Sequence, residues 1–366
     1  MESTNTLNIM ERTEKPKKKK YFFEVSFVRA IASLCIVMIH VTAMFINEMD
    51  AEPTLVYYFN QITRYGTAMF ALISGFLLFN QVNNRGFQLS YFVKSRFTKI
   101  MIPFLVWSIF YVLFRHYFQT YTLPSFQTAK EIKDFIYFFL TGESYYHLYF
   151  IAIVVQFYIL FAFLQLLRKI NHLLIATLIA FFINLYFIQF DVSTGIGIFD
   201  KFFNDHVFIL KWIFYFMIGG LLAYYWSSLS NWINKNRVTC FILGVIIVVV
   251  STIQLELNGW LSSNYRLNFF YIPIAFVAGS GLYFLLNKQP RIQNMVVKIG
   301  NLSMGIYLVH PIVIVLLNKF IPQLFLQSYL LPISYGLTVI ISILAVQLIT
   351  KVPFGNYIVT VAKVKK

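Results

Sequence analysis

Residues 22–46 read FFEVSFVRAIASLCIVMIHVTAMFI, an apolar stretch that contains Arg29 and, after ten intervening residues, His40. An ionisable side chain inside a membrane helix is costly and usually faces a protein interior or a watery cavity. In an α-helix, eleven steps return to within roughly 20° of the starting direction and cover roughly 16 Å. The two residues are therefore predicted to share one face of the first helix at two depths, as parts of a functional site.

Composition places this helix in an integral membrane protein. The 366 residues are 59% hydrophobic and 12% charged, with a mean hydropathy of +0.69, whereas about 25% of the residues of a soluble domain are charged. Apolar runs of about 20 residues, each long enough to span the hydrocarbon core, recur along the chain. We predict an all-α integral membrane protein, a bundle of about ten transmembrane helices at residues 22–46, 57–79, 99–118, 147–167, 172–190, 206–226, 238–257, 267–286, 300–319 and 329–350.

The distribution of charge predicts the orientation of these helices. With both termini in the cytoplasm, the cytoplasmic segments are all basic, at residues 12–20, 85–96, 168–169, 235–237, 288–298 and 363–366. The opposite links are poor in Lys and Arg apart from a mixed stretch at 119–146, and they carry acids such as Asp50 and Asp191. This is the positive-inside pattern. We expect one transmembrane domain at 21–350 between a disordered basic cytoplasmic tail at 1–20 and a short basic cytoplasmic tail at 351–366.

The remaining composition narrows the class of function. The formal net charge of +16 is dispersed among the cytoplasmic links, so it does not indicate a nucleic-acid partner. Cys35 and Cys240 define neither a disulfide framework nor a zinc site. Metal-ligand spacings and a Walker-type phosphate loop are missing from the sequence, so neither a metal nor a bound cofactor is expected. The internal repeat that marks many secondary transporters is missing too.

The polar residues of the first helix also have structural interpretations. Ser33 lies within about 40° of Arg29 and extends its polar stripe. Arg29 alone could snorkel to the lipid headgroups, and a lone intramembrane histidine often bonds to a neighbouring helix. Snorkelling leaves His40 unexplained, so we interpret Arg29 and His40 together as catalytic residues and Ser33 as a binding residue.

A second polar cluster lies in IYLVHP at residues 306–311. Pro311 lacks an amide hydrogen and clashes with the preceding turn, so it is expected to kink a helix near mid-membrane and free a carbonyl group. Tyr307 lies one turn before His310 and shares its face. A histidine that stabilises the kink is as good an interpretation as catalysis, so Tyr307 and His310 are candidates for substrate binding that rank below His40.

Further candidates for substrate or donor binding lie toward the outer ends of the predicted helices. Arg64 is too deep to be a simple topogenic charge, and it could pair with an acid or bind an anionic group. His147 opens the fourth helix, and Gln156 lies inside it. Interfacial positions of this kind also serve aromatic belts and rims, so these are weaker candidates.

Four passages, in this order, resemble one known family. They are Phe27–Ala32 with the Arg29-x10-His40 spacing, the segment 70–78 ending in SGFLL, the entry to the third helix RFTKIMIP at 96–103, and GNLSMGIYLVHP at 300–311. Together they resemble the bacterial acyltransferase-3 family of multi-pass membrane acyltransferases over about residues 21–350. Residues 155–160 and 212–216 further resemble the membrane component of intercellular-adhesin systems, which handle poly-β-1,6-N-acetylglucosamine.

The resemblance implies an activity, a compartment and two site residues. Family members take an acyl group, often acetyl, from cytoplasmic acyl-coenzyme A and place it on a hydroxyl of a cell-surface saccharide at the bacterial cell membrane. The family's signature arginine and histidine match Arg29 and His40. Many members also carry an extracytoplasmic hydrolase-like domain, which this chain is expected to lack. It would therefore act on a membrane-delivered, lipid-linked glycan, or a separate extracytoplasmic or glycan-synthesis partner would complete the transfer.

The predicted chemistry centres on His40. A sugar hydroxyl becomes a good nucleophile when a base takes its proton, and histidine titrates near neutral pH. His40 would act as that base or, alternatively, as an acyl carrier, while Arg29 holds coenzyme A phosphate or pantetheine oxygen. A polysaccharide exporter or flippase is the competing function, because buried ions and aromatic rows also suit the passage of sugar. The Arg29 and His40 pair and the missing repeat favour the enzyme.

Overall fold

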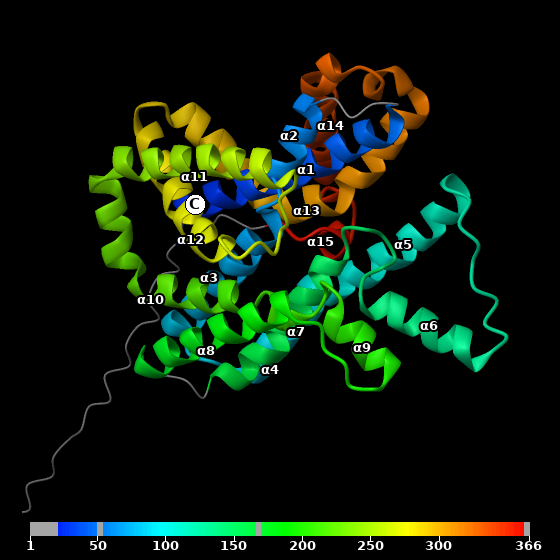
Figure 1. Cartoon of the computed structure of the whole chain (residues 1–366), viewed down its shortest axis with the longest axis horizontal. Coiled ribbons are helices and arrows are strands. Elements are labelled where there is room, and N and C mark those ends of the chain that lie inside the picture. Colours follow the sequence, from blue (N-terminus) through cyan, green and yellow to red (C-terminus); the bar gives the residue numbers. More distant parts are fainter. Residues whose placement is uncertain (1–20, 50–53, 166–169, 362–366) are drawn as a thin grey trace, which may run out of the picture.

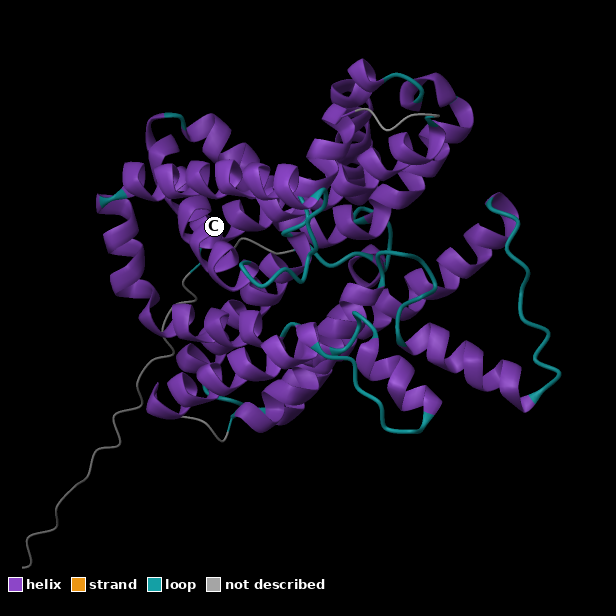
Figure 2. Ribbon diagram, viewed as in Figure 1, coloured by secondary structure: helices purple, strands orange, loops and turns teal. Residues whose placement is uncertain are grey.

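The chain is built from helices (Figures 1 and 2). The computed structural model describes residues 21–49, 54–165 and 170–361, and no strand occurs among them, which confirms the all-α fold. The predicted tail at 1–20 lies outside the described residues. The helices are α1 Phe23–Glu48, α2 Thr54–Ile62, α3 Gly66–Arg85, α4 Leu89–Arg96, α5 Ile102–Phe118, α6 Ala129–Leu140, α7 Tyr149–Leu164, α8 Ile170–Gln189, α9 Gly197–Asn204, α10 Ile213–Lys235, α11 Arg237–Asn258, α12 Asn268–Leu285, α13 Pro290–Phe320, α14 Leu331–Ile349 and α15 Gly355–Ile358.

Within the described residues, nine helical segments are long and apolar enough to cross a membrane, against the ten that the sequence predicts. The predicted helix without such a counterpart, at 147–167, contains α7, which has 16 residues. At about 1.5 Å per residue, α7 is shorter than a hydrocarbon core of about 30 Å. The sequence overestimates this helix because residues 147 and 148 form a turn, while residues 166 and 167 lie outside the described chain.

α1 lies against α13, and the two helices run in the same direction. The contacts advance along both helices together, from Ser26 beside Gly300 to Glu48, which accepts a hydrogen bond from Asn318 at 2.8 Å. At Gly300 the backbones approach so closely that the Ser26 carbonyl leaves no room for a Cβ atom. Small residues permit this close packing of membrane helices. The pairing brings residues far apart in sequence into register along one seam.

α12 packs against α1 in the opposite direction. The ring of Tyr283, late in α12, lies 5.8 Å from that of Phe27, early in α1. Gly279, one turn earlier in α12, lies beside Val28 and Ile31, which come later in α1 than Phe27. α14 returns along α13, since Ser334 near its start bonds to the Leu324 carbonyl after α13, and Val346 near its end lies beside Gly305. The end of α14 therefore lies at the same end of the bundle as the start of α1. α1 is therefore a central helix, in contact with α3, α12, α13 and α14.

The second and third membrane-length segments are irregular inside. The second is interrupted at residues 63–65, between α2 and α3, which places Arg64 in a turn. The third contains a π-helical turn, Phe97–Met101, between α4 and α5. Such turns occur frequently at functional sites. Beyond it, α5 and α6 project from the bundle and are joined by an extended loop (Figure 1).

Candidate active site

Three histidines from distant parts of the chain meet beside α1. His40 belongs to α1, His310 to α13, and His147 to the turn before α7. The rings of His40 and His310 stack with centroids 5.2 Å apart, and His147 packs edge-on against His310 at 5.6 Å. His310 and His147 are 0% and 1% exposed, whereas His40 is partly exposed. His40 is therefore the member of this cluster that a ligand reaches most readily.

The helix backbone fixes the tautomer of His310. Its Nδ1 atom lies 3.0 Å from the Ile306 carbonyl oxygen, which accepts, so the neutral ring carries its proton on Nδ1. The buried Nε2 is then an acceptor, and it has no hydrogen-bond partner among the described residues. α13 continues through Pro311, and the Tyr111 hydroxyl donates to the nearby Leu308 carbonyl at 2.7 Å. This bond joins α5 to α13 one turn before Pro311, and the kink at Pro311 stays a prediction.

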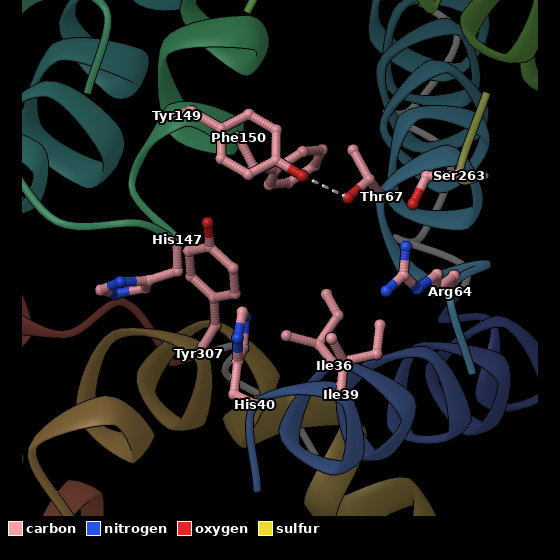
Figure 3. A pocket seen from close by; sticks show the side chains of 10 residues that line it. All are labelled: Ile36, Ile39, His40, Arg64, Thr67, His147, Tyr149, Phe150, Ser263 and Tyr307. Atoms are coloured by element: carbon pink, nitrogen blue, oxygen red, sulfur yellow. Dashed lines mark hydrogen bonds between the residues drawn. The ribbon is translucent and has the colours of Figure 1, made fainter. Parts of the chain in front are cut away.

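A cavity of about 190 Å³ lies beside the histidines (Figure 3). Its walls come from α1, the α2–α3 break, the start of α3, the turn before α7, α7 itself, α13 and the loop before α12. The lining residues are Ile36, Ile39, His40, Arg64, Thr67, His147, Tyr149, Phe150, Ser263 and Tyr307. Both ring nitrogens of His147 and the hydroxyl of Tyr307 have no hydrogen-bond partner among the described residues. The cavity therefore offers polar atoms without hydrogen-bond partners to a polar ligand.

Arg64 lies across the cavity from His147 and Tyr307 (Figure 3). Its Nη2 donates to Asn60 Oδ1 at 2.8 Å, and its Nη1 donates to the Leu261 carbonyl at 3.4 Å. Among the side chains that the structure describes, the one ion pair within 4.0 Å joins Lys201 and Glu143. The acid partner that the sequence suggested for Arg64 is therefore not found in the described part of the chain.

Arg29 and Ser33 lie away from this cavity. The Nη2 of Arg29 donates to Ser303 Oγ on α13 at 3.0 Å. Ser33 is buried, and its hydroxyl has no partner among the described residues. Neither residue belongs to the cavity lining. Arg29 and His40 thus both contact α13, at two separate depths of the same seam.

Comparison with known proteins decides the family. Residues 22–351 match the acyltransferase-3 family, described as an acyltransferase domain. The chain belongs to this family. The match covers all four passages on which the resemblance was based, and it confirms that resemblance.

The curated relatives of this chain are named as export proteins rather than as acyltransferases. One, from Staphylococcus aureus strain MSSA476, is named "Probable poly-beta-1,6-N-acetyl-D-glucosamine export protein" and is 24% identical over 313 residues, covering 81% of this chain and 83% of its own. A protein of the same name from Staphylococcus epidermidis is 25% identical over 312 residues, with 81% and 82% covered. The similarity to the poly-N-acetylglucosamine subgroup is confirmed. No solved structure matches the chain significantly.

Gln156 is placed outside the cavity of this acyltransferase-3 protein. Its Nε2 donates to the Val207 carbonyl at 2.8 Å, and its Oε1 accepts from the Ile209 amide at 3.2 Å. Both ends of the amide are thus occupied in joining α7 to the segment before α10. Gln156 is a predicted candidate for substrate or donor binding, and its partners in the structure are backbone groups.

Besides the apolar Ile36 and Ile39, sequence reasoning missed four residues of the cavity wall, namely Thr67, Tyr149, Phe150 and Ser263. The hydroxyls of Thr67 and Tyr149 lie 3.0 Å apart and join α3 to α7 (Figure 3). These residue types are common at the ends of membrane helices and carry no charge, so they gave no local signal. The proximity of Thr67 to Arg64 in the sequence was the one available indication.

Proposed function

We propose that this protein is a membrane-bound O-acyltransferase that moves an acyl group, typically acetyl, from cytoplasmic acyl-coenzyme A to a hydroxyl of a cell-surface or lipid-linked saccharide. Family membership supports acyl transfer in general. The observation that carries the proposal is the position of His40, a partly exposed imidazole on the wall of a polar cavity and stacked on His310. A general base must lie within reach of the proton that it takes.

In the proposed reaction, a ring nitrogen of His40 takes the proton of the sugar hydroxyl as the hydroxyl oxygen attacks the thioester carbonyl carbon. The tetrahedral intermediate collapses, the carbon–sulfur bond breaks, and the departing thiolate takes the proton back from the imidazolium. The products are a sugar ester and free coenzyme A, and His40 is restored. His310, whose own ring is held by Ile306, positions the ring of His40 by stacking.

Two arginines near the start of α1 support a site for the coenzyme A part of the donor. The Arg96 guanidinium carbon lies 5.1 Å from the centre of the Tyr158 ring, and Tyr158 also interacts electrostatically with Arg29. Neither arginine has a carboxylate within 4.0 Å among the described side chains. Arginine binds phosphate through a rigid fork of donors. The roughly 16 Å along α1 between Arg29 and His40 suits an extended pantetheine arm.

We further propose that both termini lie in the cytoplasm and that α7 completes a tenth crossing of the cell membrane. Consecutive crossings alternate in direction, and α12 runs against α1, so α12 must be an even-numbered crossing. The nine long segments alone make α12 the seventh, and adding α7 makes it the eighth. The parallel packing of α1 and α13, then the ninth crossing, agrees with this count.

Cysteine labelling tests this orientation. In a background without Cys35 and Cys240, a membrane-impermeant maleimide should label cysteines at positions 125 and 194 in intact cells. Cysteines at positions 3 and 365 should be labelled only after lysis. Labelling of position 3 in intact cells would contradict the proposed orientation.

Acyl transfer is tested by comparing wild type with His40→Ala and Arg29→Ala at matched membrane levels. Cells or membrane vesicles receive labelled acetyl-coenzyme A, and ester-linked label on surface glycans is measured. We expect both variants to lose labelling, and the exposed His172→Ala on α8 serves as the control because it removes an imidazole outside the cavity. Wild-type labelling by both variants would show that the mechanism is wrong.

Glycan export is the second candidate function, because the curated relatives are named export proteins. The same experiment separates the two. If His40→Ala lowers the amount of surface polymer while the remaining polymer keeps its full ester content, export is supported. If the polymer remains and its ester content is lost, acyl transfer is supported. Poly-N-acetylglucosamine is the first acceptor to test in both cases.

A further inference from the structure

We infer that the cavity holds an oxyanion, a carboxylate or a phosphate carried by one of the two substrates, against the wall formed by Arg64 and the start of α3. The identity of the substrates rests on the proposed function, but anion binding itself does not. Arg64 brings a positive charge to the cavity, and its partners among the described residues are neutral. Asp50 and Glu52 lie outside the described residues.

A hydrogen-bond network holds the Arg64 guanidinium in place. Asn60, which accepts from Arg64, donates its own Nδ2 hydrogens to the Ile39 carbonyl at 3.1 Å and to Thr42 Oγ1 at 3.0 Å. The loop carbonyl of Leu261 accepts from the other side. A guanidinium has five N–H donors, and this network uses two of them. Because the fork is held before a ligand arrives, binding costs less side-chain entropy.

The start of α3 adds a second source of positive potential to the same wall. This 20-residue helix begins at Gly66, directly after the turn that contains Arg64. The first N–H groups of a helix lack intrahelical partners, and together with the helix dipole they favour anions. Thr67 lies in this first turn and lines the cavity, and the Ser263 hydroxyl lies beside Arg64 (Figure 3). Charge, dipole and hydroxyls thus converge at one place.

The opposite wall differs in chemistry. His147 and Tyr307 are 1% and 5% exposed, line the cavity, and have polar atoms without partners among the described residues. His40 lies between the two walls, near the floor made by Ile36 and Ile39 (Figure 3). A ligand whose negative group is held at Arg64 therefore presents its other end to the histidines. Arg64 is a binding residue that selects for a charged substrate.

Anion binding is tested on the purified full-length protein in lipid nanodiscs. Inorganic phosphate and acetate are titrated by calorimetry at constant ionic strength, with wild type, Arg64→Gln and the matched control Arg266→Gln. Arg266 is an exposed cation outside the cavity, in the loop before α12 that also carries Leu261 and Ser263. We expect wild type and Arg266→Gln to bind at least one anion equally and Arg64→Gln to bind it at least roughly tenfold more weakly. Equal binding by wild type and Arg64→Gln, or no binding by either, would overturn the inference.

Arg64→Lys guards against misfolding of Arg64→Gln, because it keeps the charge while losing the fork. Arg64→Lys should bind the anion with intermediate affinity. Thermal unfolding checks that both variants are folded. If they are, wild-type affinity in Arg64→Gln would contradict the site.

Transfer assays then identify the source of the anion. If Arg64→Gln lowers transfer from a carboxylate-bearing donor such as malonyl-coenzyme A but spares acetyl-coenzyme A, the acyl group carries the charge. If transfer from both donors falls equally, the saccharide acceptor carries it. If neither falls, Arg64 takes no part in substrate binding and the inference fails. If the wild-type protein binds the anion but transfers no acyl group from either donor, the proposed function is rejected and the anion site stands.

Discussion

The two polar places along the α1–α13 seam have different surroundings. At one, the Arg29 cation donates to a single hydroxyl, that of Ser303, away from the cavity and near Tyr158. At the other, His40 stacks on His310 and opens onto a cavity. The Arg29 end of the seam thus holds a cation and, among the described residues, no histidine, whereas the His40 end holds stacked imidazoles beside a cavity. The comparison teaches that one helix can place a cation and an imidazole in different surroundings at two depths of the same seam.

The largest effect is expected at the cavity end. His40→Gln keeps a polar side chain of similar reach but removes the base, so the rate constant kcat for acyl transfer should fall at least about a hundredfold. The KM for acyl-coenzyme A should change little, because the proposed donor contacts lie at the other end. Steady-state kinetics with labelled acetyl-coenzyme A in proteoliposomes measures both constants. A kcat close to that of His172→Gln would remove His40 from the mechanism.

The next effect is expected at the Arg29 end. Arg29→Gln removes the charge proposed to hold coenzyme A phosphate, so KM for acyl-coenzyme A should rise at least roughly tenfold. Arg29→Lys should recover part of the loss, because it restores the charge without the fork. The same assay reads both variants. A fall confined to kcat, with KM unchanged, would mean that both ends of the seam serve the chemical step.

Both ends should respond together when the seam itself is disturbed. Gly300→Ala introduces a Cβ where the Ser26 carbonyl lies, and such overpacking costs about 1–3 kcal/mol. Gly336→Ala on α14 is the control, since nothing lies within 4 Å of its added Cβ. Thermal unfolding in detergent should show a lower midpoint for Gly300→Ala alone, with kcat and KM both impaired. Equal midpoints for the two variants would show that the close approach is not required.

The smallest effect is expected from Ser303→Ala. The Ser303 hydroxyl accepts one hydrogen bond from Arg29, and a single such bond contributes about 1 kcal/mol, so KM for acyl-coenzyme A should rise less than about fivefold. Arg29 itself remains available to the donor. A rise in KM as large as that of Arg29→Gln would show that Ser303 fixes the position of the guanidinium rather than only accepting one of its hydrogen bonds.

Much of the fold could be predicted from the sequence because lipid imposes a length and a polarity on each span. Nine of the ten predicted segments coincide with membrane-length helical segments of the described chain. The interruption at residues 63–65 could not be foreseen, since side chains in and beside it bond to a distant loop. The Leu261 amide donates to Gln61 Oε1 at 2.8 Å, and the Leu261 carbonyl accepts from Arg64 Nη1 at 3.4 Å. When a helix is interrupted because of contacts with a distant loop, the sequence of that helix does not indicate the interruption.

The site was predictable to the extent that it contains ionisable residues in apolar surroundings. That criterion selected His40, His147, His310 and Arg64, which the structure brings to one neighbourhood. Gln156 was also selected, as a polar residue inside an apolar helix, and its amide forms a backbone bridge rather than part of the cavity wall. The grouping of His147 with His310 needed the packing of α7 against α13, which no local pattern encodes.

The α1–α13 seam also has a consequence for how the protein is made. Arg29 and Ser303 are 274 residues apart in the sequence, so α1 is synthesised long before its partner helix exists. An arginine and a histidine must enter the membrane at a stage when the groups that later contact them are still untranslated. The cavity beside His40 is therefore among the last features of the bundle to assemble, because Tyr307 on α13 forms part of its wall.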